Sequence, residues 1–229
     1  FNQIYSTNAE GKVGLIELPA PDRSLSLDQS NEEMPYSVIN VELIKNDYTE
    51  RLIYDVQVFD GETSLLQIEM MPNEENVVPN ETTVIPRALL MDEYVLRPEA
   101  PILRDTFTLL DQVPVSLRIL HPVIIPEKIR VHLGRPSSSA RNVSVSFIDY
   151  IKNVASSEIY PTWPKESLRA NILAQISLAL NRVYTEWYPS QGYNFDITNS
   201  TAYDQYYVHG RNIFESVSEV VDDIFNNYI

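Results

Sequence analysis

The chain has 229 residues, and its 32 acidic residues against 17 basic ones give a formal net charge of −15. This balance repels the phosphates of nucleic acids, so we expect no nucleic-acid partner and favour a basic partner or a neutral substrate. The absence of cysteine excludes disulfides, thiolate nucleophiles and thiolate metal sites. The apolar content of 44% is enough for a sizeable core, in one large domain or two smaller ones.

No uninterrupted apolar run approaches the roughly 20 residues that a membrane-spanning helix needs, so we expect a protein that does not span a membrane. The first residues, Phe1 to Tyr5, do not have the pattern of a signal peptide. The chain starts without Met, and we interpret it as a fragment or a processed form.

Residues 1–71 contain short runs of alternating apolar residues separated by turn residues such as Asp60-Gly61. This spacing is typical of a small antiparallel β-sandwich. The stretches NAEGKVGLIELPAP, PYSVINVEL and VQVFDGETSLLQIEMMP resemble the transthyretin-like, carboxypeptidase-regulatory sandwich. We therefore expect a β-sandwich domain over residues 1–71.

Residues 72–126 hold eight of the fifteen prolines. Proline fixes φ and removes a backbone donor, which favours an extended linker over long regular elements. Apolar residues such as Leu89-Leu90-Met91 indicate that part of this linker packs on a domain, and the exposed remainder would suit proteolytic cleavage.

Residues 127–229 show two alternating runs, 129–133 and 143–147, which predict a β-hairpin. Helical spacing then predicts a first helix near 148–155, a second from Pro164 to about Tyr188 and a third over Arg211–Tyr228. The predicted fold class is α+β, with an N-terminal β-sandwich, a proline-rich linker and a mainly helical C-terminal domain that includes a β-hairpin.

Glu158 lies between the first two predicted helices, after small residues and before Pro161 and Pro164. A lone carboxylate at such a junction, beside aromatic side chains, is a candidate general acid. The alternative is a helix cap or a solvated charge.

Two further carboxylates, Asp196 and Asp204, lie in the stretch 195–207, where Asp, Asn, Ser and Thr favour local caps and turns. The tyrosines of this stretch could form a platform for sugar rings, and a packed tyrosine cluster is the equal alternative.

The remaining chemistry is mostly excluded by missing motifs. The three histidines lack ligand spacing and are expected to be structural, no serine stands in a Gly-x-Ser-x-Gly elbow, and the six glycines form no phosphate-binding loop. Nucleotide hydrolysis and esterase chemistry are therefore not expected.

Two C-terminal segments carry a family resemblance: DYIKNVASSEIYPTWPKESLRANILAQISLALNRVYTEWY and FDITNSTAYDQYYVHGRNIFESVSEVVDDIFNNYI. They resemble the clostridial spore cortex-lytic enzymes of the SleC family, whose catalytic region is similar to stage II sporulation protein D (SpoIID). In that family a small-small-Glu-apolar motif precedes a helix of the form Leu-Lys-Ala-Gln. The matching residues are 156–159 and 168–171, so the family's catalytic glutamate falls on Glu158.

The resemblance implies a lytic transglycosylase that cleaves the glycan strands of spore cortex peptidoglycan during germination, outside the cytoplasm. One carboxyl, Glu158, would protonate the glycosidic oxygen and then take a proton from the muramoyl 6-hydroxyl. The resemblance also implies a precursor activated by a protease, with residues 1–71 as the pro-region. Residues 127–229 would be a SpoIID-like catalytic domain that is incomplete at its C-terminus.

The resemblance further implies substrate contacts by Thr201, Gln205 and Tyr207, which match the family. A family arginine in the second helix is replaced by Ile176, which leaves Arg182 as its substitute. We expect Ile159, Tyr160 and Trp163 to form an apolar pocket that raises the pKa of Glu158 and contacts substrate.

Some relatives carry Cys and His zinc ligands near the segment that corresponds to residues 198–204. This chain has no cysteine, so we expect no zinc and no other cofactor. The alternative to an enzyme is a non-catalytic peptidoglycan-binding or spore-structural protein that uses the same aromatic surface.

Overall fold

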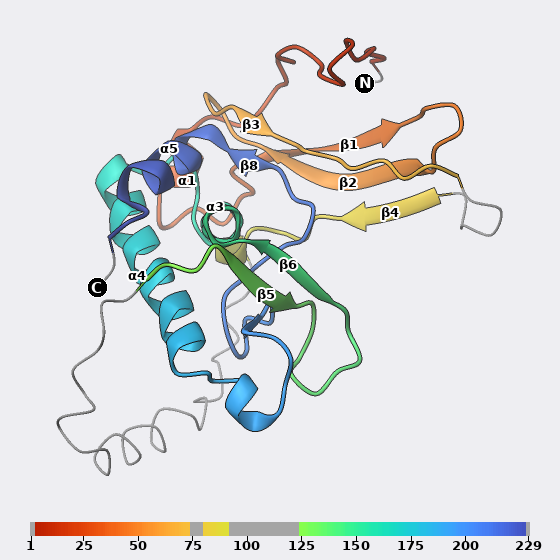
Figure 1. Cartoon of the computed structure of the whole chain (residues 1–229). Helices are drawn as coiled ribbons and strands as arrows, with labels where there is room; N and C mark the ends of the chain where they lie inside the picture. Colours follow the sequence, from red (N-terminus) through yellow and green to blue (C-terminus); the bar gives the residue numbers. More distant parts are fainter. Residues whose placement is uncertain (1–2, 74–79, 92–123, 228–229) are drawn as a thin grey trace, which may run out of the picture.

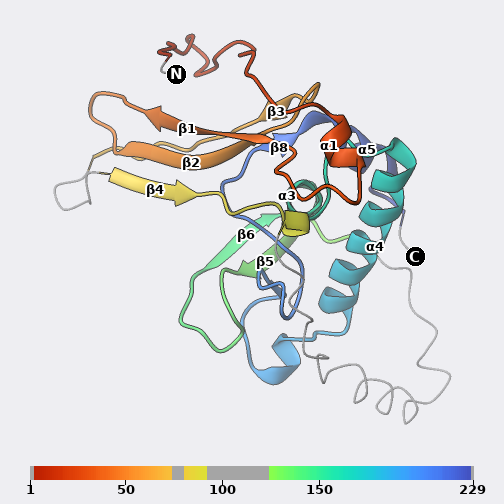
Figure 2. The same cartoon turned by 180° about the vertical axis from the view of Figure 1, so that it is seen from behind.

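The computed structural model of the chain describes residues 3–73, 80–91 and 124–227. The fold is α+β, with helix α3 (Phe147–Glu158) at its centre. A three-stranded sheet lies on one side of α3 and a β-hairpin on the other, and helices α4 and α5 cover a further side (Figures 1 and 2). This arrangement surrounds α3, so most of its side chains are buried.

The N-terminal region begins with a single turn of helix, α1 (Ser24–Leu27), and continues into the sheet. Strands β1 (Ser37–Leu43) and β2 (Glu50–Val58) are antiparallel, and β4 (Asn80–Val84) runs parallel to β2. The sheet order is β1-β2-β4.

The predicted β-sandwich over residues 1–71 is not confirmed: in the described part of this region β1 and β2 form a three-stranded sheet with β4, and β3 pairs with β8 from the C-terminal region. The apolar alternation correctly predicted β1 and β2. The alternation could not show which residues pack on the sheet. These residues come from the C-terminal part of the chain, where Tyr206 and Val208 pack with Ile53, Val56 and Ile85.

Part of the predicted linker packs on the rest of the molecule, as expected. Strand β4 pairs with β2, and the short 3-10 helix η1 (Leu89–Met91) contacts α3. The rest of the predicted linker, residues 74–79 and 92–123, lies outside the described residues.

The predicted hairpin is confirmed as β5 (Lys128–His132) and β6 (Asn142–Ser146), which are antiparallel. A two-residue strand, β7 (Ile197–Thr198), adds to β5 in parallel. Two residues cannot show a repeating pattern, so β7 could not be predicted from the sequence.

The three predicted helices are confirmed, with different ends. Helix α4 spans Lys165–Tyr184 with Pro164 as its N-cap, and the 3-10 helix η3 (Pro189–Gln191) follows it. Helix α5 spans Glu215–Ile224. It begins later than predicted because β8 (Ile213–Phe214) pairs with β3 (Ser64–Leu65) immediately before it.

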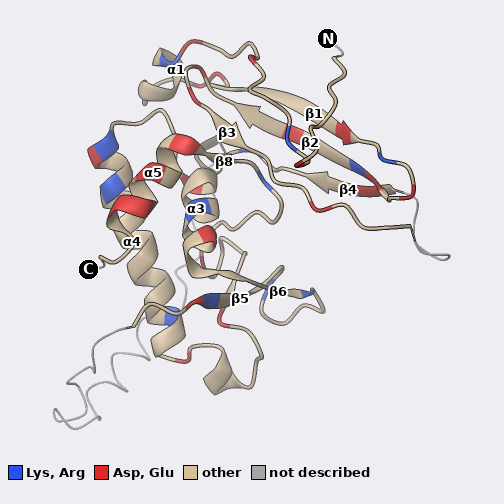
Figure 3. Cartoon of the chain, turned by 45° about the horizontal axis from the view of Figure 1, so that its top comes forward, with Lys and Arg blue, Asp and Glu red and all other residues tan. Residues whose placement is uncertain are grey.

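Charged residues lie along α3, α4 and α5, as Figure 3 shows. Among the helices of the described residues, none is both long enough and apolar enough to cross a membrane.

The main core is built around α3 and takes residues from both ends of the chain. Phe147, Ile151 and Val154 of α3 are fully buried, and each contributes roughly 1.5–3 kcal/mol by removing apolar surface from water. The N-terminal region adds Tyr36, Phe59 and Ala88 to the same cluster, so the N- and C-terminal regions share one hydrophobic core.

Candidate functional site

Glu158 is the last residue of α3. The residues before it are small because the backbone of β8 passes beside them: the Phe214 N–H donates to Ser156 Oγ at 3.4 Å. Ser157 is fully buried and its hydroxyl donates to the Asn153 carbonyl at 2.8 Å. Glu158 itself is half-buried, so the small-small-Glu motif places one carboxylate at the edge of a tightly packed helix.

The carboxylate of Glu158 is held by two N–H donors from distant parts of the chain. The backbone N–H of Tyr206 donates to Oε1 at 2.8 Å, and the side-chain amide of Gln175 donates to Oε2 at 2.9 Å. These bonds fix the orientation of the carboxyl group and stabilise its ionised form.

A buried polar chain leads away from Gln175 into the core. The Gln175 carbonyl accepts a bond from the Gln205 amide at 3.1 Å, and the Tyr150 hydroxyl donates to Gln205 Oε1 at 3.0 Å. Burial raises the pKa of Tyr150 well above its usual value, and the charges of Asp204 and Glu158 add to this effect. The Tyr150 hydroxyl is therefore neutral, and its bond to Gln205 helps to hold Gln175, which donates to Glu158.

Asn153 fixes the same segment further along α3. Its side-chain amide donates to the Val208 carbonyl and accepts from the Val208 N–H, both at 2.8 Å. Tyr150, Asn153 and Glu158 lie on one side of the helix, so α3 holds residues 205–208 along its length.

Asp204, the first alternative carboxylate, has a structural role. Its carboxylate accepts bonds from the Thr198 N–H and hydroxyl, from the Tyr188 hydroxyl and from Arg182 Nε, at distances from 2.5 to 3.0 Å. Its side chain is 0% exposed, and burial and this charge together raise the pKa of Tyr188. Asp204 therefore organises the loop and has no exposed oxygen for a substrate.

Asp196, the second alternative, joins β7 to β5. Its carboxylate accepts the Arg130 backbone N–H at 2.8 Å and pairs with the Arg130 guanidinium at 2.9 Å. This geometry gives Asp196 a structural role, although its side chain, like that of Glu158, is partly exposed.

The predicted contact residues Thr201, Gln205, Tyr207 and Arg182 are near this network, and two of them are buried. Gln205 belongs to the chain behind Glu158, and Tyr207 stacks on Tyr150 with ring centroids 5.5 Å apart. Arg182 is bonded to Asp204, and Thr201 is half-buried in the turn before it. In this state Gln205, Tyr207 and Arg182 support the site from within the fold.

Tyr160 and Trp163 make their described contacts with the N-terminal region. The Tyr160 ring is 5.5 Å from Phe59, and the Trp163 indole N–H donates to the Ser26 carbonyl at 3.1 Å. The two donors to the Glu158 carboxylate are polar groups, and the apolar pocket expected from Ile159, Tyr160 and Trp163 stays a prediction.

Within residues 3–73, 80–91 and 124–227, no group of three or more His, Asp and Glu side chains is placed to hold a metal ion. Tyr150, Asn153 and Gln175 were missed in the sequence. Tyr150 lies in the first predicted helix, whereas Glu158 was expected just beyond its end, and the structure places both in α3. The pairing of Gln175 with Glu158 depends on how α4 packs on α3.

Comparison with known families gives a match over residues 138–224 to the SpoIID family, described as Stage II sporulation protein. The matched stretch includes α3, α4 and the loop that holds Glu158, so this region is SpoIID-like and is connected with sporulation. No curated protein and no solved structure matches the chain.

Proposed function

We propose that the protein is a lytic transglycosylase that cleaves the glycan strands of spore cortex peptidoglycan, as the enzymes of the SleC family do. The observation that carries the proposal is the half-buried carboxylate of Glu158, oriented by Gln175 and Tyr206 in the SpoIID-like region. The other carboxylates of the region that were considered, Asp196 and Asp204, are occupied by structural bonds.

In this mechanism Glu158 acts first as an acid and then as a base. Its proton passes to the glycosidic oxygen as the bond between that oxygen and the anomeric carbon breaks. The muramoyl 6-oxygen then bonds to the anomeric carbon and returns its proton to Glu158, which leaves a 1,6-anhydro end and restores the acid. A single carboxyl suffices, unlike the two carboxyls of most glycosidases.

The protonated form of Glu158 must be populated when substrate is bound. The two N–H donors favour the carboxylate, and a glycan lying over the half-buried side chain would remove water from it and favour the acid. The balance between these effects would set the working pH of the enzyme.

The test is to incubate the full-length protein with cortex peptidoglycan and to analyse the products for anhydro-muramic ends by mass spectrometry. Glu158→Gln should lower turnover by roughly 10²–10⁴-fold, because the amide can neither donate nor recover the proton, while glycan binding is retained. Glu166→Gln is the matched control, since Glu166 is an exposed residue of α4 and should leave turnover unchanged.

Binding to peptidoglycan without any anhydro product would instead support the alternative, a non-catalytic wall-binding or spore-structural protein. A large loss of turnover at Asp196 or Asp204 with none at Glu158 would mean that the wrong carboxylate has been chosen.

We also propose that the protein is made as a precursor that a protease activates. The N-terminal region reaches the residue that holds Glu158: the Tyr206 hydroxyl donates to the Arg87 carbonyl at 3.4 Å, and η1 contacts α3. Turnover measured before and after cleavage between Pro72 and Pro126 tests this, and equal rates would contradict it.

A further inference from the structure

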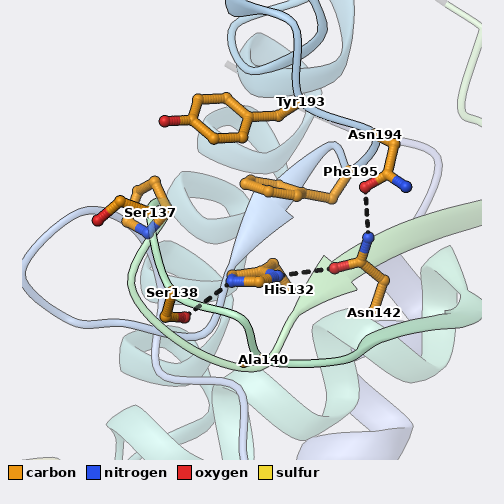
Figure 4. A pocket seen from close by; sticks show the side chains of 9 residues that line it. His132, Ser137, Ser138, Ala140, Asn142, Tyr193, Asn194 and Phe195 are labelled. Atoms are coloured by element: carbon orange, nitrogen blue, oxygen red, sulfur yellow. Dashed lines mark hydrogen bonds between the residues drawn. The ribbon is translucent and has the colours of Figure 1, made fainter.

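A hollow of about 360 Å³ lies at the end of β5, and Glu158 is not among its lining residues. It is formed by the loop between β5 and β6 and the loop between η3 and β7 (Figure 4). The first loop can fold tightly because Gly134 has no side chain: a Cβ there would lie 2.4 Å from Ser138 Oγ. The volume is within the range of about 300–1,000 Å³ found for small-molecule sites.

One side of this pocket is a stack of rings. Figure 4 shows the rings of Tyr193, Phe195 and His132 one above another. The ring centroid of Phe195 lies 5.1 Å from that of Tyr193 and 4.6 Å from that of His132. The rings of Phe195 and His132 are nearly parallel, with an angle of 17° between their planes. Phe195 and His132 are buried, whereas Tyr193 is half-buried and can present part of its ring to a ligand.

The stack is held rigidly by hydrogen bonds that also occupy His132. Its Nδ1 is 2.7 Å from Asn142 Oδ1, and its Nε2 is 3.0 Å from Ser138 Oγ. Asn142 in turn donates to Asn194 Oδ1 at 2.7 Å. Both ring nitrogens are therefore engaged within the protein, so His132 serves as part of the wall.

The rim offers neutral polar groups. Ser137 contributes a hydroxyl and Asn194 an amide, both on exposed residues, beside the apolar Pro136 and Ala140. Among the described residues, no Asp, Glu, Lys or Arg lines this pocket, although the chain carries a net charge of −15. The lining thus fits a neutral ligand that combines an apolar face with hydroxyl and amide groups.

We propose that this pocket binds one N-acetylhexosamine ring of a glycan strand, as a subsite remote from Glu158. The apolar face of the sugar would pack on Tyr193, its acetamido group would meet Asn194, and the acetyl methyl would lie against Pro136 and Ala140. The choice of a glycan as ligand rests on the proposed function. The requirement for a neutral ring with an apolar face and an amide group rests on the residues that line the pocket.

One segment of chain connects the pocket with Glu158. His132 is the β5 partner of Thr198 in β7, Thr198 is bonded to Asp204, and the N–H of Tyr206 holds Glu158. A strand anchored in the pocket would therefore be held by the same segment, residues 198–206, that orients the carboxylate.

The test is titration of the full chain, as the Glu158→Gln variant, with the tetramer of N-acetylglucosamine, followed by calorimetry and by NMR shifts of residues 193–195. Tyr193→Ala should weaken binding at least 10-fold. Ser137→Trp, which fills the opening from an exposed position, should do the same without loss of fold. Tyr54→Ala, a change of an exposed tyrosine on β2, is the matched control and should leave the affinity unchanged.

The deacetylated tetramer should bind more weakly than the acetylated one, because it lacks the acetamido group that meets Asn194 and the acetyl methyl that lies against Pro136 and Ala140. Unchanged affinity of the folded Tyr193→Ala and Ser137→Trp variants for the acetylated tetramer would overturn the proposal. Equal affinity for the acetylated and deacetylated tetramers would overturn it as well. These binding results do not depend on turnover, so failure of the pocket and failure of Glu158 as the catalytic residue can be told apart.

Discussion

The N-terminal sheet and the surroundings of α3 differ in how completely they are buried. Strand β1 alternates between half-buried and exposed residues, whereas eight of the twelve residues of α3 are buried. The sheet's own small cluster, Ile53, Val56 and Ile85, is completed by Val208 from the C-terminal region. The N-terminal region therefore has little core of its own and depends on the region that carries Glu158.

Polar bonds between the two regions support this conclusion. The Asn212 side-chain amide donates to the Gln57 carbonyl at 3.0 Å, and Arg211 donates to Gln57 Oε1 at 3.3 Å, all in buried positions. Separating the regions would expose these groups without partners, at about 1–3 kcal/mol each. A pro-region built in this way would remain attached after the chain is cut.

The largest expected effect comes from Phe59, the N-terminal residue that packs on Tyr160 and Phe214 in the shared core. Phe59→Ala should lower the free energy of unfolding by about 3–5 kcal/mol. Both tryptophans, Trp163 and Trp187, are in the C-terminal region. Urea unfolding followed by their fluorescence therefore reports on that region and, through the bond from Trp163 to Ser26, on its contact with the N-terminal region.

The control for this experiment is Val38→Ala, an exposed position on β1, which should change stability by less than about 0.5 kcal/mol. If Phe59→Ala left the tryptophan transition unmoved, the two regions would be separate folding units.

A smaller effect should be seen at alkaline pH. Burial raises the pKa of Tyr207 to about 12, above the usual value of 10.0, so between these two values the unfolded chain has already lost a proton that the folded chain keeps. The contribution of neutral Tyr207 to the free energy of unfolding is fully present below pH 10. It is lost as the pH rises toward 12, which lowers the free energy of unfolding by about 2–3 kcal/mol.

Tyr207→Phe removes the ionisable group, so its unfolding free energy should fall less steeply over this pH window than that of the natural chain. Tyr54→Phe changes an exposed tyrosine and should reproduce the natural slope. Identical slopes for all three proteins would show that Tyr207 is not buried in solution.

Replacing Gln175 should change the pH dependence of turnover more than it changes the rate of turnover. Gln175→Leu removes one N–H donor from the Glu158 carboxylate, which destabilises the anion and raises the pKa of the proposed catalytic acid. Because the acid form is required, the fall in kcat/KM at high pH should move to higher pH. Gln67→Leu, an exposed change in the N-terminal region, should leave the profile unmoved, and a lower rate with an unshifted profile would give Gln175 a purely structural role.

The smallest effect is expected on association after cleavage. Limited proteolysis should cut first between Pro72 and Pro126, and the two fragments should still elute together in size-exclusion chromatography until denaturant is added. First cuts inside α4, or fragments that separate in native buffer, would contradict the shared core.

The sequence by itself determined the elements whose patterns are local. The hairpin over residues 128–146 and the helices α3 and α4 follow from alternating and helical spacing. The place of Glu158 at the end of α3 was also readable, because small residues precede it and prolines follow it. These features depend on residues that are close in the chain.

Only the tertiary structure decided what those elements meet. In place of the predicted sandwich, Val208, far away in sequence, packs on the sheet of β1, β2 and β4, and β8 pairs with β3. Strands β7 and β8 are too short to show a pattern. The donors to Glu158 lie 17 and 48 residues beyond it, and the same packing fixed Asp204 as a buried structural carboxylate. Periodicity identifies which face of an element is apolar, whereas the partner of that face is set by how distant segments pack together.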